Sequence, residues 1–260
     1  MDDLLKLTGV CKSYKRGDSS LRVLVDVKLR MGVREIGAVL GSRGQGKSTL
    51  LQIAAGLLAP DRGEVWFGDV ELTRCSDDRR ARVLRHEIAW IHREGTGLDL
   101  EVLDYVALPL WTGRRWSLLS YRRGKREAEH AARIALERVG AEACTGLRWG
   151  DLSNWDRVLV AFARGIARGP RLMVVDDVID GFGMSKTREA GELLLSFAQE
   201  SGCAILMSVS DIEAAQVAER VWGFEHGGLT LLRGRDDGEA EIVELHGDPL
   251  KRRGSRGAAS

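Results

Sequence analysis

Residues 41–48 have the sequence Gly41-Ser42-Arg43-Gly44-Gln45-Gly46-Lys47-Ser48, which fits the pattern G-x-x-x-x-G-K-[ST]. The apolar run Glu35 to Leu40 precedes this stretch and predicts a β-strand. The stretch Thr49 to Leu58 follows it and predicts a helix. A strand, a glycine-rich loop and a helix in this order are typical of a loop that holds phosphate groups.

Each residue type in this loop suits phosphate binding. Glycine lets backbone N–H groups turn inward and form a nest for anions. Lys47 adds a positive charge for the β- and γ-phosphates of a nucleotide, and Ser48 supplies a hydroxyl ligand for Mg²⁺. Thr49 extends the cap of the helix. We therefore expect residues 41–49 to bind the phosphates of a nucleotide.

The second Mg²⁺ ligand of such a site is an aspartate at the end of another apolar strand. Leu172-Met173-Val174-Val175-Asp176 supplies it, so Asp176 is the predicted Mg²⁺ partner. Helices predicted at Asn154 to Arg168 and near Met184 to Glu200 flank this strand, and Ala204 to Val209 predicts the next strand. The alternation of strands and helices predicts a parallel sheet covered by helices.

Two other parts of the chain differ in character. Leu4 to Val10 and Leu21 to Met31 are β-like runs that predict an antiparallel N-terminal sheet. Between about Thr73 and Asp151 the chain is rich in Arg, Glu and Ala with helical periodicity, which predicts an inserted helical subdomain.

The predicted fold is therefore α/β, a P-loop NTPase (RecA-like) core with an N-terminal antiparallel β subdomain and an inserted helical subdomain. We expect one domain over residues 1–235, followed by a polar and flexible tail at 236–260. Its predicted parts are the β subdomain at about 1–33, the core at about 34–93 and 158–235, and the helical subdomain at about 94–157.

Composition argues against several functional classes. The 260 residues include 39 basic and 38 acidic side chains, mixed along the chain with a net charge of +1, so we expect no nucleic-acid partner. No run of about 18 apolar residues exists, and Met1-Asp2-Asp3 lacks the positive charge of a secretory signal, so we expect a cytoplasmic location. Four cysteines, none in a C-x-x-C pair, are expected to be reduced structural thiols.

The order and spacing of these motifs resemble the ABC ATPase family from Leu4 to about Leu232. Tyr14 stands where the family has an aromatic residue that stacks on adenine. The segments at 50–58 and 60–65 are very similar to the family's helix and following turn. Val102 to Leu110 resembles the lipoprotein-release, macrolide-export and cell-division subgroup.

This resemblance implies a subunit that binds ATP and Mg²⁺ at the interface of a dimer and acts on a membrane partner. The implied partners are a transmembrane permease subunit and a second ABC ATPase, in a homodimer or heterodimer. The implied location is cytoplasmic, peripheral on the inner face of the cell membrane.

The family's LSGGQ motif, which contacts the ATP of the opposite subunit, appears here as Leu152-Ser153-Asn154-Trp155-Asp156. Both glycines are replaced, and glycine is what permits a close approach of the backbone to phosphate. We expect Trp155 to obstruct that approach, whereas Ser153 keeps one hydroxyl contact.

The residues that act on water in the family also differ. The catalytic glutamate is Asp177, which is shorter by one methylene, and Val178 stands where a proline usually follows. Ser210 replaces the switch histidine and is too short to reach the γ-phosphate as histidine does. The Q-loop glutamine falls at His92 or Arg93. The carboxylate moves back by about 1.5 Å, and a misplacement of about 1 Å costs on the order of a hundredfold in rate, so slow hydrolysis is expected.

The sequence is compatible with two functions. One is a transport ATPase subunit with slow hydrolysis, and the other is a non-hydrolysing pseudo-ATPase that scaffolds or regulates a complex with a consensus ABC ATPase. Soluble ABC proteins of translation or DNA repair carry two ATPase units or a long coiled-coil insertion, which this chain lacks. A small-molecule kinase would need acceptor-binding and lid elements.

Overall fold

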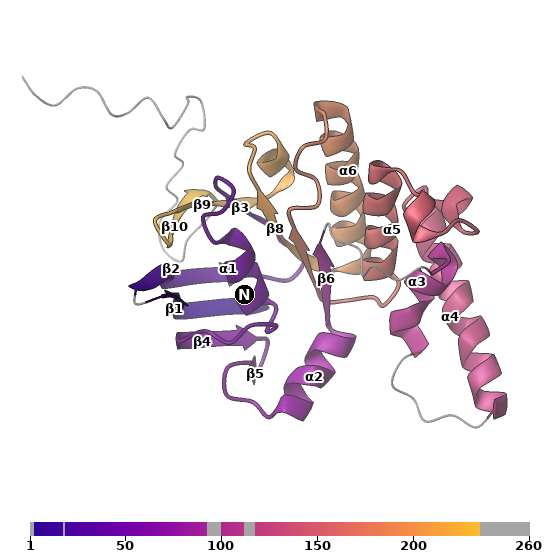
Figure 1. Ribbon diagram of the computed structural model, residues 1–260, viewed down its shortest axis with the longest axis horizontal. Coiled ribbons are helices and arrows are strands. Elements are labelled where there is room, and N and C mark those ends of the chain that lie inside the picture. The colour runs from indigo at the N-terminus through magenta and orange to yellow at the C-terminus, as the bar shows by residue number, and fades with distance from the viewer. Residues whose placement is uncertain (1–2, 18, 93–99, 112–117, 235–260) are drawn as a thin grey trace, which may run out of the picture.

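The computed structural model describes residues 3–17, 19–92, 100–111 and 118–234 (Figure 1). The predicted tail at 236–260 and Arg93 lie outside the described residues. The described chain contains a six-stranded sheet, a four-stranded sheet and the helices that cover them. Within this part of the chain, no helix is long and apolar enough to cross a membrane.

The six-stranded sheet has the order β10-β9-β3-β8-β7-β6. Neighbouring strands from β9 to β6 run parallel, and β10 pairs antiparallel with β9 at one edge. The predicted parallel sheet is therefore confirmed, and its carboxyl ends place the phosphate loop beside Asp176. The strands are β3 (Ile36–Leu40), β6 (Ile88–His92), β7 (Leu172–Asp176), β8 (Ala204–Val209), β9 (Arg220–Glu225) and β10 (Gly228–Arg233).

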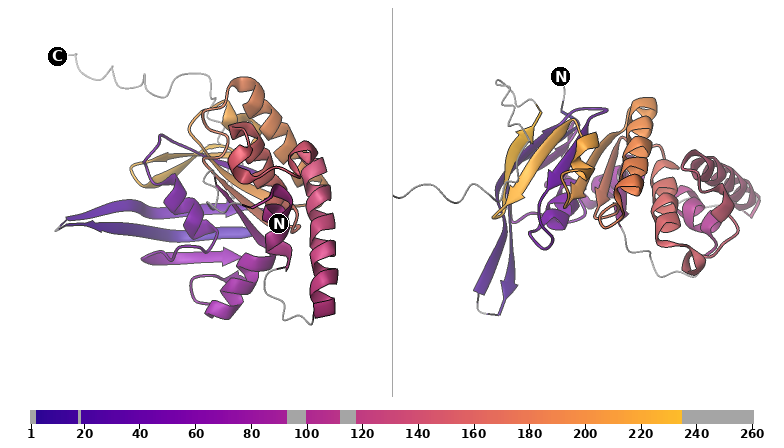
Figure 2. Two further views of the ribbon diagram at one scale, coloured as in Figure 1. Left: turned by 45° about the vertical axis from the view of Figure 1, so that its right-hand side comes forward. Right: turned by 90° about the horizontal axis from the view of Figure 1, so that it is seen from above.

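The four-stranded antiparallel sheet has the order β2-β1-β4-β5. Its first two strands, β1 (Leu5–Arg16) and β2 (Ser19–Met31), are longer than the predicted runs, and they extend away from the rest as a hairpin in Figure 2. The other two, β4 (Arg62–Phe67) and β5 (Val70–Glu71), come from a stretch that the sequence boundaries placed in the core. Residues 1–33 thus supply only half of this sheet, because β4 pairs with β1 from Leu5 to Cys11.

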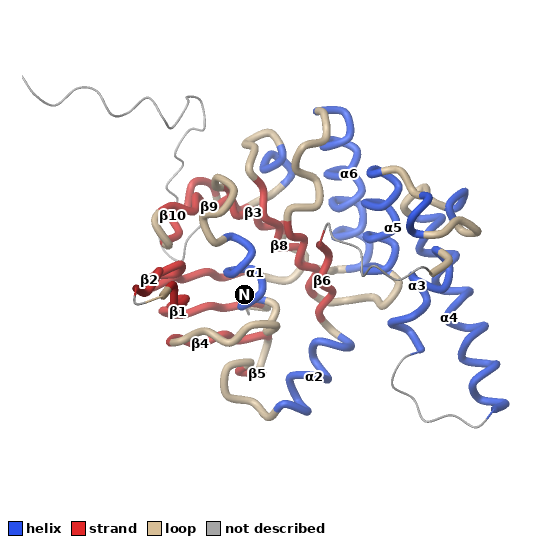
Figure 3. Tube along the Cα trace, viewed as in Figure 1, coloured by secondary structure: helices blue, strands red, loops and turns tan. Residues whose placement is uncertain are grey.

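The helices lie on both sides of the larger sheet (Figure 3). Helix α1 follows the phosphate loop, α5 and α6 lie side by side along the sheet (Figures 1 and 2), and α3 and α4 pack on α5. The helices are α1 (Lys47–Ala54), α2 (Asp77–His86), α3 (Val102–Trp111), α4 (Leu118–Arg138), α5 (Asn154–Ile166) and α6 (Met184–Ser201). Short 3-10 turns lie at Glu142–Cys144, Trp149–Asp151 and Ala214–Val217.

The core has two halves because successive side chains of a strand point to opposite faces of a sheet. In β7, Leu172 and Val174 pack toward α1 and the antiparallel sheet, whereas Met173 and Val175 pack toward α5 and α6. Both faces of the central strands are therefore buried, and this explains the unbroken apolar runs in the sequence.

The helical segment shares a core with the larger sheet. One continuous cluster of buried residues joins Val106 of α3 and Ala132 of α4 to Phe162 of α5 and Met173 of β7. Phe162 is fully buried within this cluster. The segment that the sequence predicted as an insertion therefore packs on the sheet through α5.

Replacing Phe162 with alanine should lower the free energy of unfolding by about 3–5 kcal/mol, because it removes a buried ring and leaves a cavity. Leu21→Ala is the matched control, since Leu21 is 54% exposed and should cost within about 0.5 kcal/mol. Denaturant unfolding of both variants measures the difference. Equal losses would contradict the assignment of Phe162 to the core.

Cysteine accessibility gives a second test of the core. Burial raises the pKa of the Cys203 thiol to about 12, so this thiol stays protonated at neutral pH and reacts poorly. Cys11 and Cys75 are only half-buried. In the native protein at pH 8, we expect iodoacetamide to label these two well before Cys203, as peptide mass spectrometry would report. Rapid labelling of Cys203 would show that the sheet opens there.

Candidate functional site

The phosphate loop connects the end of β3 to the start of α1. At two of its glycines, a side chain would clash with neighbouring residues. Gly46 has φ 112°, and a Cβ there would lie 2.4 Å from Cγ1 of Val23. A Cβ on Gly41 would lie 2.8 Å from the carbonyl oxygen of Phe224. The neighbouring strands β2 and β9 therefore press on the loop, and larger residues would push it out of its turn.

Lys47 lies inside the loop and is buried. Its Nζ donates to the carbonyl oxygens of Gly41 at 2.5 Å and Ser42 at 3.0 Å, and to Oγ of Ser210 at 3.2 Å. Burial lowers the pKa of Lys47, and the nearby carboxylates of Asp180, Asp177 and Asp176 oppose this shift. The ammonium is thus held at the centre of the loop by carbonyl and hydroxyl oxygens.

Gln45 stabilises the entrance to this loop. Its Oε1 accepts a hydrogen bond from the backbone N–H of Ser42 at 2.9 Å. Gly44 has φ 78°, a conformation that glycine adopts without steric cost. These contacts fix the backbone of residues 42–45 in the turn that the nest requires.

Asp176 ends β7 and is buried. Its Oδ1 accepts a hydrogen bond from Oγ of Ser208 at 2.7 Å, and the same hydroxyl accepts one from the backbone N–H of Asp177 at 2.9 Å. Ser208 therefore fixes both carboxylate-bearing residues relative to β8. The sequence prediction missed Ser208, although it interrupts the apolar residues of β8 with a hydroxyl.

Asp177 has an unusual backbone conformation, with φ 53°. Aspartate tolerates this left-handed region better than most residues, and the absence of a proline at 178 permits it, since a proline restricts the preceding residue to extended conformations. The Asp177 carboxylate lies 3.8 Å from Nη2 of Arg43. The Asp177 carboxylate is therefore carried by a left-handed backbone and lies beside the phosphate loop.

Asp180 is a further acidic residue of the site that the sequence prediction did not assign. Its Oδ1 accepts a hydrogen bond from the backbone N–H of Ser210 at 3.2 Å, and it is buried. Asp180 and Lys47 thus both hold Ser210. These contacts tie Ser210, the residue predicted at the switch-histidine position, to the phosphate loop.

A cavity of about 350 Å³ lies between the loop and the end of β7. It brings together most of the predicted nucleotide and metal residues with Asp177 and Ser208. The residues that line it are Arg43, Gly44, Gly46, Lys47, Ser48, Thr49, Asp176, Asp177 and Ser208. Loop, strand end and helix start therefore form one hollow.

Mg²⁺ prefers oxygen ligands, and this cavity offers the Ser48 hydroxyl and the Asp176 carboxylate. Their donor chemistry fits the ion. No group of three or more His, Cys, Asp or Glu side chains that could hold a metal by themselves occurs among the described residues. Such a pair suits an ion that shares its coordination with phosphate and water.

Tyr14 lies near the start of α1, on the hairpin strand β1. Its hydroxyl is 3.5 Å from Oγ1 of Thr49, and the residue is 41% exposed. Lys12 Nζ lies 5.9 Å from the centre of the Tyr14 ring. The exposed aromatic ring therefore stands beside the phosphate loop, where a base could stack on it.

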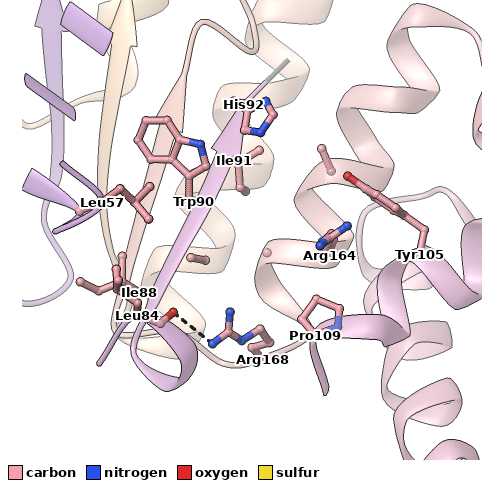
Figure 4. A pocket seen from close by; sticks show the side chains of 14 residues that line it. Leu57, Leu84, Ile88, Trp90, Ile91, His92, Tyr105, Pro109, Arg164 and Arg168 are labelled. Carbon is pink, nitrogen blue, oxygen red and sulfur yellow. Dashed lines mark hydrogen bonds between the residues drawn. The ribbon is translucent and has the colours of Figure 1, made fainter. Parts of the chain in front are cut away.

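His92 lies at the carboxyl end of β6, opposite Asp176 in the strand register. It lines a hollow of about 230 Å³ together with Asn154, Arg157 and Val178. Figure 4 shows His92 at the tip of β6 and at the margin of a second pocket. His92 thus lies between the metal-side strand and the start of α5.

The second pocket, of about 240 Å³, lies between β6 and helices α3 and α5 (Figure 4). Tyr105 and Pro109 form part of its wall, and the Arg164 guanidinium lies 4.3 Å from the centre of the Tyr105 ring. Burial and the positive charges of Arg164 and Arg85 lower the pKa of Arg168, which also lines it. The pocket is therefore partly apolar with concentrated positive charge.

The segment predicted to correspond to LSGGQ, residues 152–156, makes its hydrogen bonds and ring contacts within its own chain. Ser153 caps α5, where its Oγ accepts from the Asp156 backbone N–H at 3.1 Å and donates to the Asp156 carboxylate at 2.6 Å. The Trp155 ring packs edge-on against Phe182 at 5.3 Å, and Lys186 Nζ lies 4.6 Å from the indole centre. Trp155 is thus half-buried against the start of α6.

Comparisons with known proteins identify the family. Residues 24–180 match the family model described as ABC transporter. The lipoprotein-releasing system ATP-binding protein LolD of Cereibacter sphaeroides is 32% identical over 229 residues, which cover 87% of this chain and 99% of that protein. LolD of Idiomarina loihiensis is 28% identical over 234 residues, with 90% and 99% covered.

Solved structures give the same result for the fold, and the predicted P-loop NTPase class is confirmed. A dimeric, post-hydrolysis structure of the ATP-binding cassette MJ0796 with ADP and Pi is similar at a TM-score of 0.78 and 25% identity, covering 89% of this chain and 99% of that one. A second dimeric structure of MJ0796, a bacterial ABC transporter cassette, has a TM-score of 0.80, also at 25% identity with the same coverage. The chain belongs to the ABC transporter family, as one of its ATP-binding subunits.

Proposed function

We propose that this chain binds MgATP in the cavity of the phosphate loop, hydrolyses it slowly, and drives or regulates a membrane partner of the lipoprotein-releasing type. The observation that carries the proposal is the buried ammonium of Lys47, held by Gly41 and Ser42 beside the hydroxyl of Ser48 and the carboxylate of Asp176. Similarity to LolD over nearly the whole of both chains supports the type of partner.

Each residue of the cavity has a defined task in binding. The loop N–H groups and Lys47 hold the β- and γ-phosphates, Ser48 and Asp176 hold Mg²⁺, and Tyr14 stacks on adenine. Ser208 keeps the Asp176 carboxylate in the orientation that a Mg²⁺ ligand needs, and an ion held there would neutralise phosphate charge.

Slow hydrolysis follows from the groups that would act on the attacking water. Asp177 is the carboxylate that accepts a proton from water or orients it, and its short side chain and backbone direction place it poorly for this task. The Ser210 hydroxyl accepts a hydrogen bond from Lys47 and is therefore directed toward the phosphate loop. His92 at the end of β6 is the proposed Q-loop residue and can still hydrogen-bond water.

The second ABC subunit completes the site in this proposal, as a second copy or a paralogue. The dimeric cassette structures support such an interface. Ser153, Asn154 and Trp155 would face the ATP of the partner, with Ser153 already engaged as the α5 cap. Loss of the two glycines weakens that contact.

The proposed membrane partner is a transmembrane permease subunit, which would keep the chain peripheral on the inner face of the membrane. Its proposed contact is the pocket in Figure 4, because apolar Tyr105 and Pro109 with positive Arg164 and Arg168 suit a helical loop that carries an acidic group. His92 links this pocket to the hollow beside Asn154.

The pseudo-ATPase alternative gains no support from the comparisons. The similar proteins are ATP-binding proteins of a release system, and the similar cassette was captured after hydrolysis. A scaffold role would be indicated only if turnover with the membrane partner were indifferent to Asp177→Ala.

Lys47→Ala should lower the affinity for MgATP by at least about tenfold, because a charge-assisted contact to phosphate is lost. Lys28→Ala is the matched control, since Lys28 is a 70% exposed lysine in a loose pair with Asp26. Isothermal titration calorimetry measures both. Unchanged binding by the Lys47 variant would sink the proposed site.

Restoring the family's residues tests the reason for slow turnover. Glutamate alone at 177 would be strained at a positive φ, so we expect Asp177→Glu to change the rate little. Adding Val178→Pro and Ser210→His should raise turnover by about tenfold or more, because proline favours an extended residue 177. Phosphate release measures the rates. Rapid turnover by the unaltered protein would instead mean that Asp177 suffices.

A further inference from the structure

The mouth of the phosphate cavity holds an ion pair that has no role in the proposed binding of MgATP. Arg43, in the middle of the phosphate loop, lies with Nη2 3.8 Å from Oδ1 of Asp177. The Arg43 side chain is 63% exposed and that of Asp177 is 41% exposed. Both residues line the cavity with Lys47 and Ser48.

Arg43 can readily exchange its carboxylate partner, Asp177, for a phosphate group. At 3.8 Å, and with the Arg43 side chain largely in water, the pair contributes little to stability. A phosphate group offers more negative charge than a carboxylate, and the planar fork of arginine matches it with two parallel hydrogen bonds. Arg43 is therefore held loosely, and phosphate is a better partner for it.

In the described part of the chain, two cationic side chains line the cavity, Arg43 and Lys47. They differ in burial and in the number of hydrogen bonds that hold them. Lys47 is buried and donates to Gly41, Ser42 and Ser210. Arg43 is exposed at the mouth. Because Asp177 is the residue that would face the attacking water, its neighbour Arg43 would lie beside the γ-phosphate and add a second cation to the contact that Lys47 makes there.

We propose that Arg43 is the residue by which this chain distinguishes a nucleoside triphosphate from a diphosphate. When MgATP enters, the guanidinium leaves Asp177 and donates to the oxygens of the γ-phosphate. With MgADP, Arg43 stays on Asp177. This inference rests on the proposed function, namely that the cavity binds MgATP.

The exchange has a second effect on the same site. While Arg43 contacts Asp177, the carboxylate is partly neutralised and turned toward the loop. Once Arg43 has moved to the γ-phosphate, the Asp177 carboxylate loses this neighbouring cation and becomes a stronger acceptor for a hydrogen bond from water. Arg43 is thus a specificity residue that also positions Asp177.

Calorimetric titration of MgATP and MgADP into the unaltered protein and Arg43→Ala tests the assignment. We expect the affinity for MgATP to fall about tenfold, as for loss of a charge-assisted hydrogen bond, and that for MgADP to change less than about twofold. Arg74→Ala is the matched control, because Arg74 is 73% exposed and lies 3.7 Å from Glu64, outside this cavity. Arg43→Lys keeps the charge and should retain part of the preference for MgATP.

Asp177→Asn adds a readout that a merely structural role would not change. Freed from its carboxylate partner, Arg43 should bind MgATP more tightly, by about threefold to tenfold, and the gain should be smaller in Arg43→Ala/Asp177→Asn. Circular dichroism and melting of each variant report folding. Arg43 is exposed and Asp177 is partly exposed, and Asp177→Asn keeps the shape of the side chain, so we expect native spectra.

Equal losses for MgATP and MgADP in Arg43→Ala would overturn the inference, since they would mean general attraction of anions. Unchanged binding of both nucleotides would overturn it as well. Failure of the proposed function has a different signature, because the unaltered protein would then bind neither nucleotide, and Lys47→Ala would change nothing.

Discussion

The buried ammonium of Lys47 is the constraint around which this cassette is organised. Taking an ammonium out of water is unfavourable unless carbonyl or carboxylate groups surround it. Here the carbonyls of Gly41 and Ser42 and the hydroxyl of Ser210 do so, while Asp176 and Asp180 add negative charge nearby. The loop, the end of β7 and the segment after β8 are thereby joined at one point. The sheet holds these three segments at one edge because its central strands are parallel.

Binding and turnover are served by different parts of the same edge. The groups for phosphate and metal lie on rigid elements, at the start of α1 and the end of β7, and Ser208 locks the carboxylate from the neighbouring strand. The proposed groups for water chemistry, Asp177 and Ser210, lie one residue beyond the ends of β7 and β8. Because they stand apart from the proposed phosphate and metal ligands, hydrolytic geometry can change separately from nucleotide affinity.

The sequence predicted the phosphate loop and the central strands because their signals are local. Fixed glycine and lysine spacing defines the loop, and runs such as Leu172 to Asp176 define strands that are buried on both faces. The role of β4 and β5 was not predictable, since the choice of β1 as partner depends on contacts distant in sequence. The β9–β10 hairpin was also missed. Its turn has positive φ at both His226 and Gly227, without the Asn-Gly or Asp-Gly pair that usually marks such a turn.

Motif spacing predicted which residues belong to the site. It did not predict which of them are joined by hydrogen bonds or ion pairs. The hydrogen bonds from Ser208 to Asp176 and from the Ser210 backbone to Asp180 connect segments about 30 residues apart. The pair between Arg43 and Asp177 depends on the left-handed backbone of Asp177, which spacing does not reveal. That backbone also couples neighbouring positions. With valine at 178, aspartate fits a conformation that glutamate resists, so a single substitution at 177 meets a backbone suited to the present pair. Residues 177 and 178 therefore have to change together before position 177 can take up an extended backbone without strain.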